Sequence, residues 1–217
     1  MRVDTAPGWA RFLLTVYGVA LASVWYLYML LLRPTIRVTV VDAEQLRPGQ
    51  HYVFCHWHDA IPLLFQAGTP RIPRVLMQRP HAWLQHPLWY MKPVHVVLRM
   101  LGVRRIVLGS SGHDGRAAAD TLVQMLREGY STFVFPDGPA GPRHELKLGV
   151  LHMAQQSGVP IVPLRLSGSR VRRARTWDRK ALALPFSTIT VRIGEPISVA
   201  NDEDFARVKD TLTAALG

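Results

Sequence analysis

The sequence predicts an α/β domain in which helices flank a single β-sheet, preceded by an N-terminal membrane helix. Short β-branched runs alternate with helical patterns after about residue 35, which is typical of helices packed on one sheet. Residues 12–32 are 21 residues without a charge, enough to cross a hydrocarbon core. The 217 residues suffice for one domain with a sizeable core. We therefore expect a membrane anchor over residues 1–34 and one catalytic domain over residues 35–217.

The predicted membrane helix lies between Arg11 and Arg33 and carries Trp25, Tyr26 and Tyr28 near one end. Aromatic residues at this position are typical of a membrane interface. A signal peptide is the alternative, because residues 20–22 read Ala-Leu-Ala like a cleavage site. The apolar run continues for ten residues beyond that point, which favours an anchor. Arginines at both ends leave open whether the helix spans the bilayer or lies in its interface.

Six apolar, β-branched runs follow the anchor and are predicted to form strands. They cover approximately residues 36–41, 52–55, 104–108, 132–135, 161–166 and 189–193. No internal repeat or low-complexity segment interrupts them, which favours one sheet rather than a repeat architecture.

Three helices are predicted between and after these strands. In residues 116–127, Ala118, Leu122 and Leu126 share one face, and Gly129 is well placed as the residue after the helix. Residues 150–156 end in the same way at Gly158. A closing helix is expected after residues 201–204, which carry a helix-start signal, with its apolar stripe at Phe205, Val208 and Leu212.

The charge balance is basic, with 26 Lys and Arg against 15 Asp and Glu, a formal net charge of +11. Such a chain suits an anionic partner: a phospholipid surface, a nucleic acid or an acidic carrier protein. No nucleic-acid-binding motif accompanies the charge, so we expect no nucleic-acid partner. Cys55 is the only cysteine, which excludes an intrachain disulfide and favours a cytoplasmic catalytic domain.

The first candidate site is Cys-His-Trp-His-Asp at residues 55–59, where a predicted strand ends. Reactive groups often emerge at strand ends in α/β folds. The imidazole of His56 or His58 has a pKa near working pH and can accept a proton from an alcohol, while Asp59 can orient a ring. A solvated or hydrogen-bonded His-rich loop is the plain alternative. A zinc site lacks a clear third ligand, and we expect no metal.

The second candidate is the small-residue turn at residues 109–116, which includes Ser110 and Ser111 and leads into a helix at Arg116. Exposed amides at a helix N-terminus attract phosphate, and Arg104, Arg105 and Arg116 can add hydrogen bonds to it. The turn is not a P-loop, because it lacks the Gly-Lys-Ser/Thr ending. A glycine-rich connection without a ligand is the alternative.

The third candidate covers residues 135–143, a strand end followed by a turn with three prolines and two glycines. Proline and glycine in this density fix an unusual backbone path. The turn offers Asp137, Gly138, Pro139 and Arg143 at the end of the strand. By itself the composition indicates rigidity, and a stiff surface turn is the alternative.

Together, these segments resemble the lysophospholipid acyltransferase-like superfamily and, within it, a bacterial branch of Asp-Gly-Pro-x-Gly-Pro type described as a domain of unknown function. The resemblance covers most of residues 53–199. Its matching motifs are Trp57-His58, the Gly-Ser-Ser turn at 109–111, the Asp-Gly-Pro block at 137–142, Gly149-Val150, residues 157–163, Trp177-Asp178-Arg179, Pro185-Phe186 and Gly194-Glu195-Pro196. The Asp-Gly-Pro block is the most specific of them.

The resemblance implies a histidine base that activates an acceptor hydroxyl for attack on an acyl thioester, with no covalent acyl-enzyme and no cofactor. It also implies that residues 137–139 replace the Glu-Gly-Thr block of glycerolipid acyltransferases. One departure concerns the histidine's partner. The superfamily places an Asp five residues after the base, where this chain has Leu63 after His58 and Ile61 after His56.

The identity of the base and of its carboxylate partner is therefore open in the sequence. The Trp-His pair favours His58, which we expect to be the base, whereas the strand-end position favours His56 as the alternative. Asp59 is too close in sequence to either histidine to copy the usual geometry. We expect Asp137, approaching from a neighbouring strand, to supply the missing carboxylate.

The function expected from the resemblance is acyl transfer from acyl carrier protein or coenzyme A to a hydroxyl of a lysophospholipid in the bilayer. A lipid A precursor is the alternative acceptor. A non-catalytic lipid-binding protein on the same fold is the alternative of another class, suggested by the absent His-Asp spacing. We expect the anchor to hold the chain at the bacterial inner membrane, with the domain on the cytoplasmic side.

Overall fold

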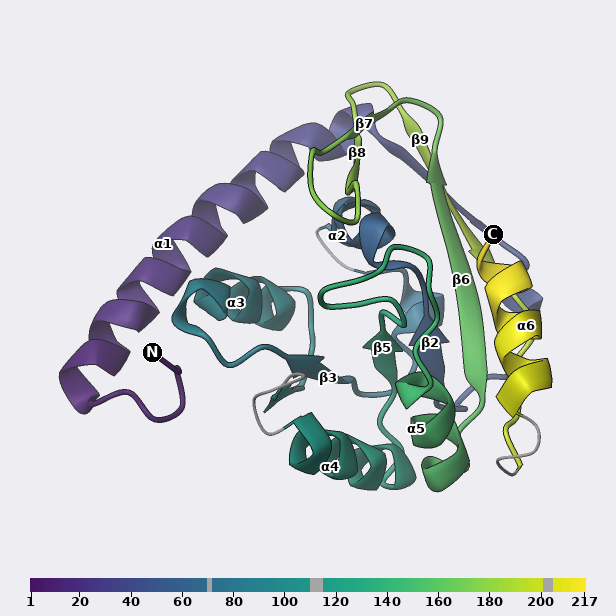
Figure 1. The fold of residues 1–217 in the computed structure, drawn as a ribbon. Coiled ribbons are helices and arrows are strands. Elements are labelled where there is room, and N and C mark those ends of the chain that lie inside the picture. Colours follow the sequence, from purple (N-terminus) through teal and green to yellow (C-terminus); the bar gives the residue numbers. More distant parts are fainter. Residues whose placement is uncertain (70–71, 110–114, 201–204) are drawn as a thin grey trace.

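A computed structural model describes residues 1–69, 72–109, 115–200 and 205–217 and contains a central sheet of five strands in the order β1-β9-β6-β2-β5 (Figure 1). All neighbouring pairs are parallel except β6 and β9. A parallel pair, β3 and β4, continues the sheet beyond β5, where His81 bridges Ser131. The strands are β1 (Arg37–Val41), β2 (Val53–Cys55), β3 (Ala82–Gln85), β4 (Arg105–Leu108), β5 (Thr132–Val134), β6 (Ile161–Gly168) and β9 (Thr188–Ile193).

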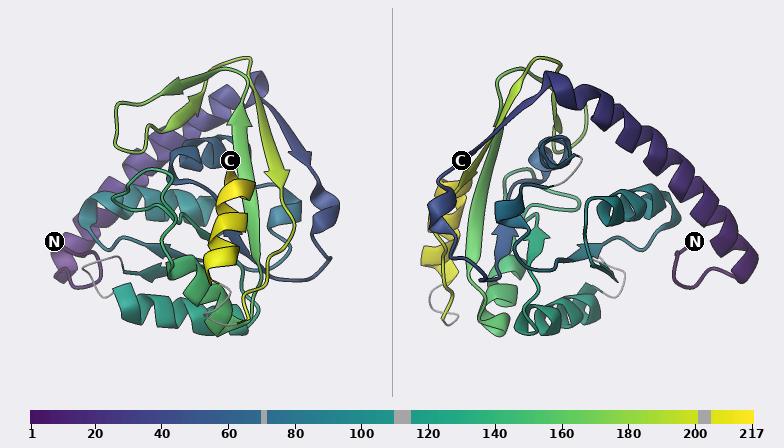
Figure 2. Two further views of the ribbon diagram at one scale, coloured as in Figure 1. Left: turned by 45° about the vertical axis from the view of Figure 1, so that its right-hand side comes forward. Right: turned by 180° about the vertical axis from the view of Figure 1, so that it is seen from behind.

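Helices cover both faces of this sheet, as Figure 1 and Figure 2 show. Side chains alternate between the faces along β2: Phe54 joins a core cluster with α1, α2 and α3, whereas Val53 and Cys55 join one with α4, α5 and α6. The helices are α1 (Gly8–Leu32), α2 (Ile61–Gly68), α3 (Lys92–Met100), α4 (Gly115–Arg127), α5 (Gly149–Ser157) and α6 (Phe205–Leu216). Short 3₁₀ turns are η1 (Arg33–Thr35), η2 (Ala43–Gln45), η3 (His58–Ala60), η4 (Arg74–Leu76) and η5 (Trp89–Met91).

The predicted α/β class is confirmed, and each of the six predicted strands is present with ends shifted by at most two residues. The predicted helix ends are also confirmed: Gly129 and Gly158 have φ of +91° and +71°, the left-handed conformation that glycine adopts most easily after a helix. The closing helix is α6, while its predicted start signal at residues 201–204 lies outside the described residues.

Four features were not predicted: β3, α2, α3 and a hairpin formed by β7 (Val171–Arg173) and β8 (Ala181–Ala183). The strand β3 is four residues long and mixes Ala, Trp, Leu and Gln, so its sequence shows neither a β-branched run nor an alternation. The hairpin strands have three residues each and are rich in arginine or alanine, so neither shows the apolar β-branched run that predicts a strand. Their pairing comes from tertiary packing, because β8 lies against α2 and Gln66 hydrogen bonds both backbone groups of Ala183.

The N-terminal helix α1 packs on the domain along a narrow face. Its buried residues, Ala10, Leu14, Gly18, Ala22 and Met29, recur at helical spacing. The helix packs mainly on α3, and the ring of Trp25 lies 5.2 Å from that of Phe65 in α2. The rest of its apolar surface is exposed, and only 22% of its most apolar stretch is buried. Together with η1 it is long and apolar enough to cross a membrane.

Close contact between α1 and α3 requires a glycine at position 18. A Cβ atom there would lie 2.5 Å from Lys92 Cγ and 3.4 Å from the Lys92 carbonyl carbon. We expect Gly18→Leu to destabilise the protein by about 1–3 kcal/mol through overpacking. At about 2–4 °C per kcal/mol, thermal melting in detergent should show the loss.

The matched control is Gly8→Leu in the same helix, because no atom lies within 4 Å of a Cβ at position 8. It should melt near the parent temperature. Equal melting temperatures for the two variants would contradict the docking of α1 on α3 through Gly18.

Candidate active site

His58 lies at the carboxyl edge of the central sheet, just after β2. The strand ends at Cys55, and Trp57 is extended and leads into η3, whose first residue is His58. The backbone N–H of His58 donates a hydrogen bond to Asp137 Oδ1 over 2.9 Å. This bond fixes the start of η3, so that the His58 side chain reaches the surface with 17% of its area exposed.

A carboxylate on the β7–β8 hairpin holds the His58 ring. The distance from His58 Nδ1 to Asp178 Oδ2 is 2.6 Å, and Asp178 is fully buried. Lys180 Nζ donates to the same oxygen, and Thr176 Oγ1 donates to Asp178 Oδ1. Because a carboxylate only accepts hydrogen bonds, Nδ1 carries the proton and Nε2 keeps its lone pair.

The electrostatics of this group favour a neutral imidazole beside an ionised carboxylate. Burial lowers the pKa of His58 below its usual value, Lys180 lowers it further, and Asp178 opposes both effects. Burial would raise the pKa of Asp178, but hydrogen bonds from Lys180, Thr176 and His58 outweigh it and bring that pKa to about 2. At neutral pH the ring is therefore equipped to accept a proton at Nε2.

The turn at residues 136–142 shapes the space around the ring. A Cβ on Gly138 would lie 2.9 Å from His58 Cδ2 and 3.6 Å from Nε2, so glycine keeps the approach to Nε2 open. The Trp177 ring lies 5.1 Å from the His58 ring, and a Cβ on Gly141 would lie 2.7 Å from Trp177 Cε3. The glycines of this turn thus serve close approach to His58 and Trp177. Pro139, between them, is exposed.

Asp137 does not take the place that the sequence suggested for it. Its Oδ1 accepts from the His58 backbone N–H and its Oδ2 from the His144 backbone N–H over 3.0 Å. Both oxygens of this fully buried side chain are therefore used to fix two loops. The carboxylate that hydrogen bonds the His58 ring is Asp178, whose position depends on a hairpin that was not predicted.

His56 is enclosed in the core. Its ring lies 4.8 Å from the ring of Phe135, its exposed fraction is zero, and Nδ1 donates to the Trp57 carbonyl. Burial lowers the pKa of His56 to about 4. The strand ends at Cys55, and the strand-end position had favoured His56 as the base. The His56 ring nevertheless points into the core. Cys55 is buried as well, and burial raises the pKa of its thiol.

Asp59 forms an ion-pair cluster rather than a bond with either of the two candidate base rings. Its Oδ2 accepts from Arg143 Nη2 at 2.7 Å and Arg173 Nη1 at 3.1 Å, and lies 3.3 Å from His144 Nε2. The His144 ring in turn stacks on Trp57, with 4.9 Å between ring centroids. Burial would raise the pKa of Asp59, but Arg143 and His144 hold it below its usual value. The predicted substrate-binding residue Arg143 thus uses one of its guanidinium nitrogens, Nη2, to bind Asp59.

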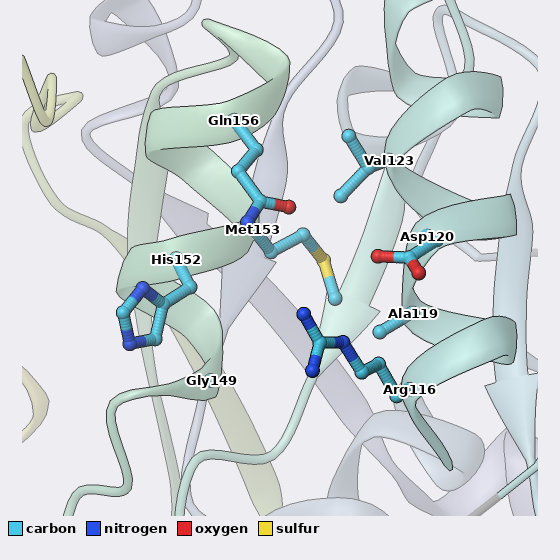
Figure 3. Close-up of a pocket in the computed structure, with 8 residues that line it drawn as sticks. All are labelled: Arg116, Ala119, Asp120, Val123, Gly149, His152, Met153 and Gln156. Atoms are coloured by element: carbon cyan, nitrogen blue, oxygen red, sulfur yellow. The ribbon is translucent and has the colours of Figure 1, made fainter. Parts of the chain in front are cut away.

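The predicted phosphate-binding arginines do not gather around His58. Arg104 precedes β4 and Arg105 begins it, at the opposite edge of the sheet from the end of β2. Strands β5 and β3 intervene, so the lateral separation alone is about 14 Å. Arg116 lines a groove of about 350 Å³ between α4 and α5, where Figure 3 shows it with Asp120 and His152. Ser110 and Ser111 lie outside the described residues.

Among the described residues, no cluster of three or more His, Cys, Asp or Glu side chains is arranged to hold a metal ion. The residues beside the His58 ring that sequence reasoning missed are Asp178 and Lys180. Asp178 lies 120 positions after His58, too far for any spacing rule to connect them. The only signal was Trp177-Asp178-Arg179, which the sequence resemblance contained without a role.

The comparisons with known proteins concern the family and the fold of the chain. The model of the family described as "Acyltransferase" matches residues 37–167. An uncharacterised protein of Rickettsia prowazekii (strain Madrid E) is 24% identical over 162 residues, covering 75% of this chain and 71% of that protein. Human 1-acyl-sn-glycerol-3-phosphate acyltransferase beta is 26% identical over 186 residues, covering 83% of this chain and 64% of the human protein.

The fold has a counterpart among solved structures. The crystal structure of the 1-acyl-sn-glycerophosphate acyltransferase PlsC of Thermotoga maritima matches with a TM-score of 0.54 and 15% identity, over 94% of both chains. This likeness concerns the fold. The family match covers more than half of the chain and includes His58 and the Asp-Gly-Pro block. The chain belongs to the acyltransferase family, within the lysophospholipid acyltransferase-like superfamily.

Proposed function

We propose that the protein transfers a fatty acyl group from an acyl thioester to a hydroxyl of a membrane lysophospholipid. The observation that carries this proposal is the contact of 2.6 Å between His58 Nδ1 and the buried Asp178, which leaves Nε2 free to accept a proton. The human and Thermotoga relatives are named for acyl transfer to acylated glycerol phosphate, which supports this class of acceptor. Acyl carrier protein or coenzyme A carries the acyl group.

The proposed reaction has one transfer step between two substrates. His58 Nε2 takes the proton of the acceptor hydroxyl while the oxygen attacks the thioester carbonyl. The new C–O bond forms, the C–S bond breaks, and the leaving thiolate takes the proton from His58. Asp178 holds the productive tautomer and stabilises the imidazolium that forms between the two proton transfers. Gly138 leaves room for the acceptor beside Nε2.

The proposed location is the cytoplasmic side of the bacterial inner membrane, with α1 as the anchor. One face of α1 contacts α3, and Trp25 contacts Phe65 of α2, while the opposite face is apolar and exposed. A helix crossing the bilayer in this arrangement would carry Lys92 and Arg99 of α3 into hydrocarbon, which is costly. We therefore favour an α1 that lies in the membrane interface with the domain docked beneath it.

The base is tested by His58→Ala. Acyl transfer should fall by about 10²- to 10⁴-fold, the usual contribution of a positioned base, without loss of folding. The assay measures acyl transfer by purified protein with lysophosphatidic acid and, separately, with a lipid A precursor as acceptor. His56→Gln is the matched variant, because its buried ring donates only to a backbone carbonyl, and it should affect stability more than turnover. An active His58→Ala protein would contradict the mechanism.

Substitutions of the two buried aspartates, Asp178 and Asp137, should have different effects on turnover and on stability. Asp178→Asn keeps the side-chain shape but removes the charge facing His58, so we expect reduced kcat with a folded protein. Asp137→Asn weakens hydrogen bonds from two backbone amides, each worth about 1.5–3 kcal/mol to a charged acceptor, so we expect a lowered melting temperature. Measuring kcat and thermal melting for both variants checks the assignment. Reversed results would assign the catalytic partner to Asp137.

The pH dependence of kcat/KM tests the position of Lys180. A base works only while neutral, so activity is lost as pH falls through the pKa of His58. Lys180 lowers that pKa and shares Asp178 with the ring. Lys180→Met should therefore raise the pKa and move the acid limb of the profile to higher pH. Arg179→Met, an exposed neighbour, is the control and should leave the limb in place. An unchanged limb in Lys180→Met would exclude this role.

A further inference from the structure

An exposed phenylalanine lies at the carboxyl end of α1. Phe186 is 77% exposed and has φ of +61°, a conformation that residues other than glycine, asparagine and aspartate seldom adopt. Together with residues 34–37 it lines a shallow pocket, and the Arg37 backbone N–H donates to the Ser187 carbonyl over 2.9 Å. The phenyl ring is thus an exposed apolar group close to the carboxyl end of α1, which also carries the exposed Leu31.

The β7–β8 hairpin next to Phe186 is strongly basic. Between residues 169 and 184 there are six basic residues and one acidic residue, Asp178. Lys180 and Arg173 are engaged by Asp178 and Asp59. The other four, Arg170, Arg172, Arg175 and Arg179, are exposed, together with Trp177 at 41% and Leu182 at 36%. The hairpin therefore combines exposed positive charge with exposed apolar side chains.

These features form a continuous path from α1 to the active site. Arg170 Nη1 donates to the Pro185 carbonyl, and Ser187 Oγ donates to the Arg170 carbonyl, so the base of the hairpin adjoins Phe186. At the other end of the hairpin, Trp177 contacts the ring of His58. Figure 1 shows β7 and β8 close to the end of α1, on the opposite side of the molecule from α4.

We propose that this region, the hairpin surface formed by Phe186, Trp177, Leu182 and the four exposed arginines, is a second membrane contact that binds the headgroups of anionic phospholipids. Arginine pairs with phosphate in a bidentate geometry, and aromatic rings favour the level of the headgroups. The inference rests on the proposed function, since it brings the opening beside His58 to the surface that holds the lipid acceptor.

A bilayer fits the hairpin surface better than an acidic carrier protein does. Positive charge alone would suit either partner. The exposed phenyl ring of Phe186, close to the end of α1, suits a bilayer that already contacts the exposed apolar face of that helix. A carrier protein is retained as an outcome of the experiment.

The insertion of Phe186 is tested with an environment-sensitive nitrobenzoxadiazole dye on Phe186→Cys in the full-length protein. Cys55 is the only native cysteine and is buried, so the dye should react at the new position. Ala214→Cys, exposed on α6, is the matched control. With vesicles of phosphatidylcholine and phosphatidylglycerol, emission at 186 should shift to the blue and be quenched by spin-labelled lipid. Emission at 214 should not change. A water-like signal at both positions would overturn the proposal.

The charge of the hairpin is tested in the same labelled protein by Arg172→Glu with Arg175→Glu. The quenching at position 186 should fall several-fold toward its value with pure phosphatidylcholine vesicles. Arg207→Glu with Lys209→Glu on α6 makes the same change in net charge and should preserve the quenching. If the hairpin variant keeps full quenching and instead slows acyl transfer only from acyl carrier protein, the surface belongs to the carrier. The dye signal needs no turnover, so it can succeed or fail independently of the proposed reaction.

Discussion

A buried negative charge, the carboxylate of Asp178, determines how the active site is built. An ionised carboxylate without partners is very costly to bury, so its environment has to supply donors. His58, Lys180 and Thr176 do so, and they come from two separate parts of the chain, η3 and the β7–β8 hairpin. Moving the hairpin away from η3 would leave the charge with one partner fewer. The hairpin is therefore part of the candidate active site, although it lies outside the central sheet and its sequence shows no strand pattern.

Three aspartates near His58 have different roles because different donors reach them. Asp178 meets the ring, Asp137 meets two backbone amides, and Asp59 meets two arginines and the ring of His144. The chemical type is the same in each case, and only the fold decides which carboxylate adjusts the base. A histidine–aspartate pair requires a short Nδ1–oxygen distance and not a fixed spacing in sequence. This explains how the chain can lack the usual spacing after either histidine and still place a carboxylate 2.6 Å from a ring nitrogen.

The sequence predicted the fold well because the central strands and the helices on one face are governed by local patterns. Runs such as β6 and β9 are apolar and β-branched, and α4 has a single apolar face followed by Gly129. The sequence located the segments that form the site but not the hydrogen bonds between their side chains. Residues 55–59 and 135–143 do meet around His58, as parallel strands that end at one edge require. The partner of the ring depends on a pairing between β7 and β8 that is stabilised by contacts with α2, and no local pattern encodes it.

The surroundings of His58 also fit the environment in which we propose that it works. An anionic membrane surface has a potential of about −30 mV, which concentrates protons and lowers the local pH by about half a unit. A histidine with an ordinary pKa would lose part of its neutral form there. Burial and Lys180 lower the pKa of His58, whereas Asp178 alone would raise it. A basic residue in contact with the catalytic carboxylate thus keeps the base neutral close to the lipid, while Asp178 still orients the ring. Lys180 contacts Asp178 and lowers the pKa of the proposed base, whereas the four exposed arginines of the hairpin surface are the charges that would attract the membrane.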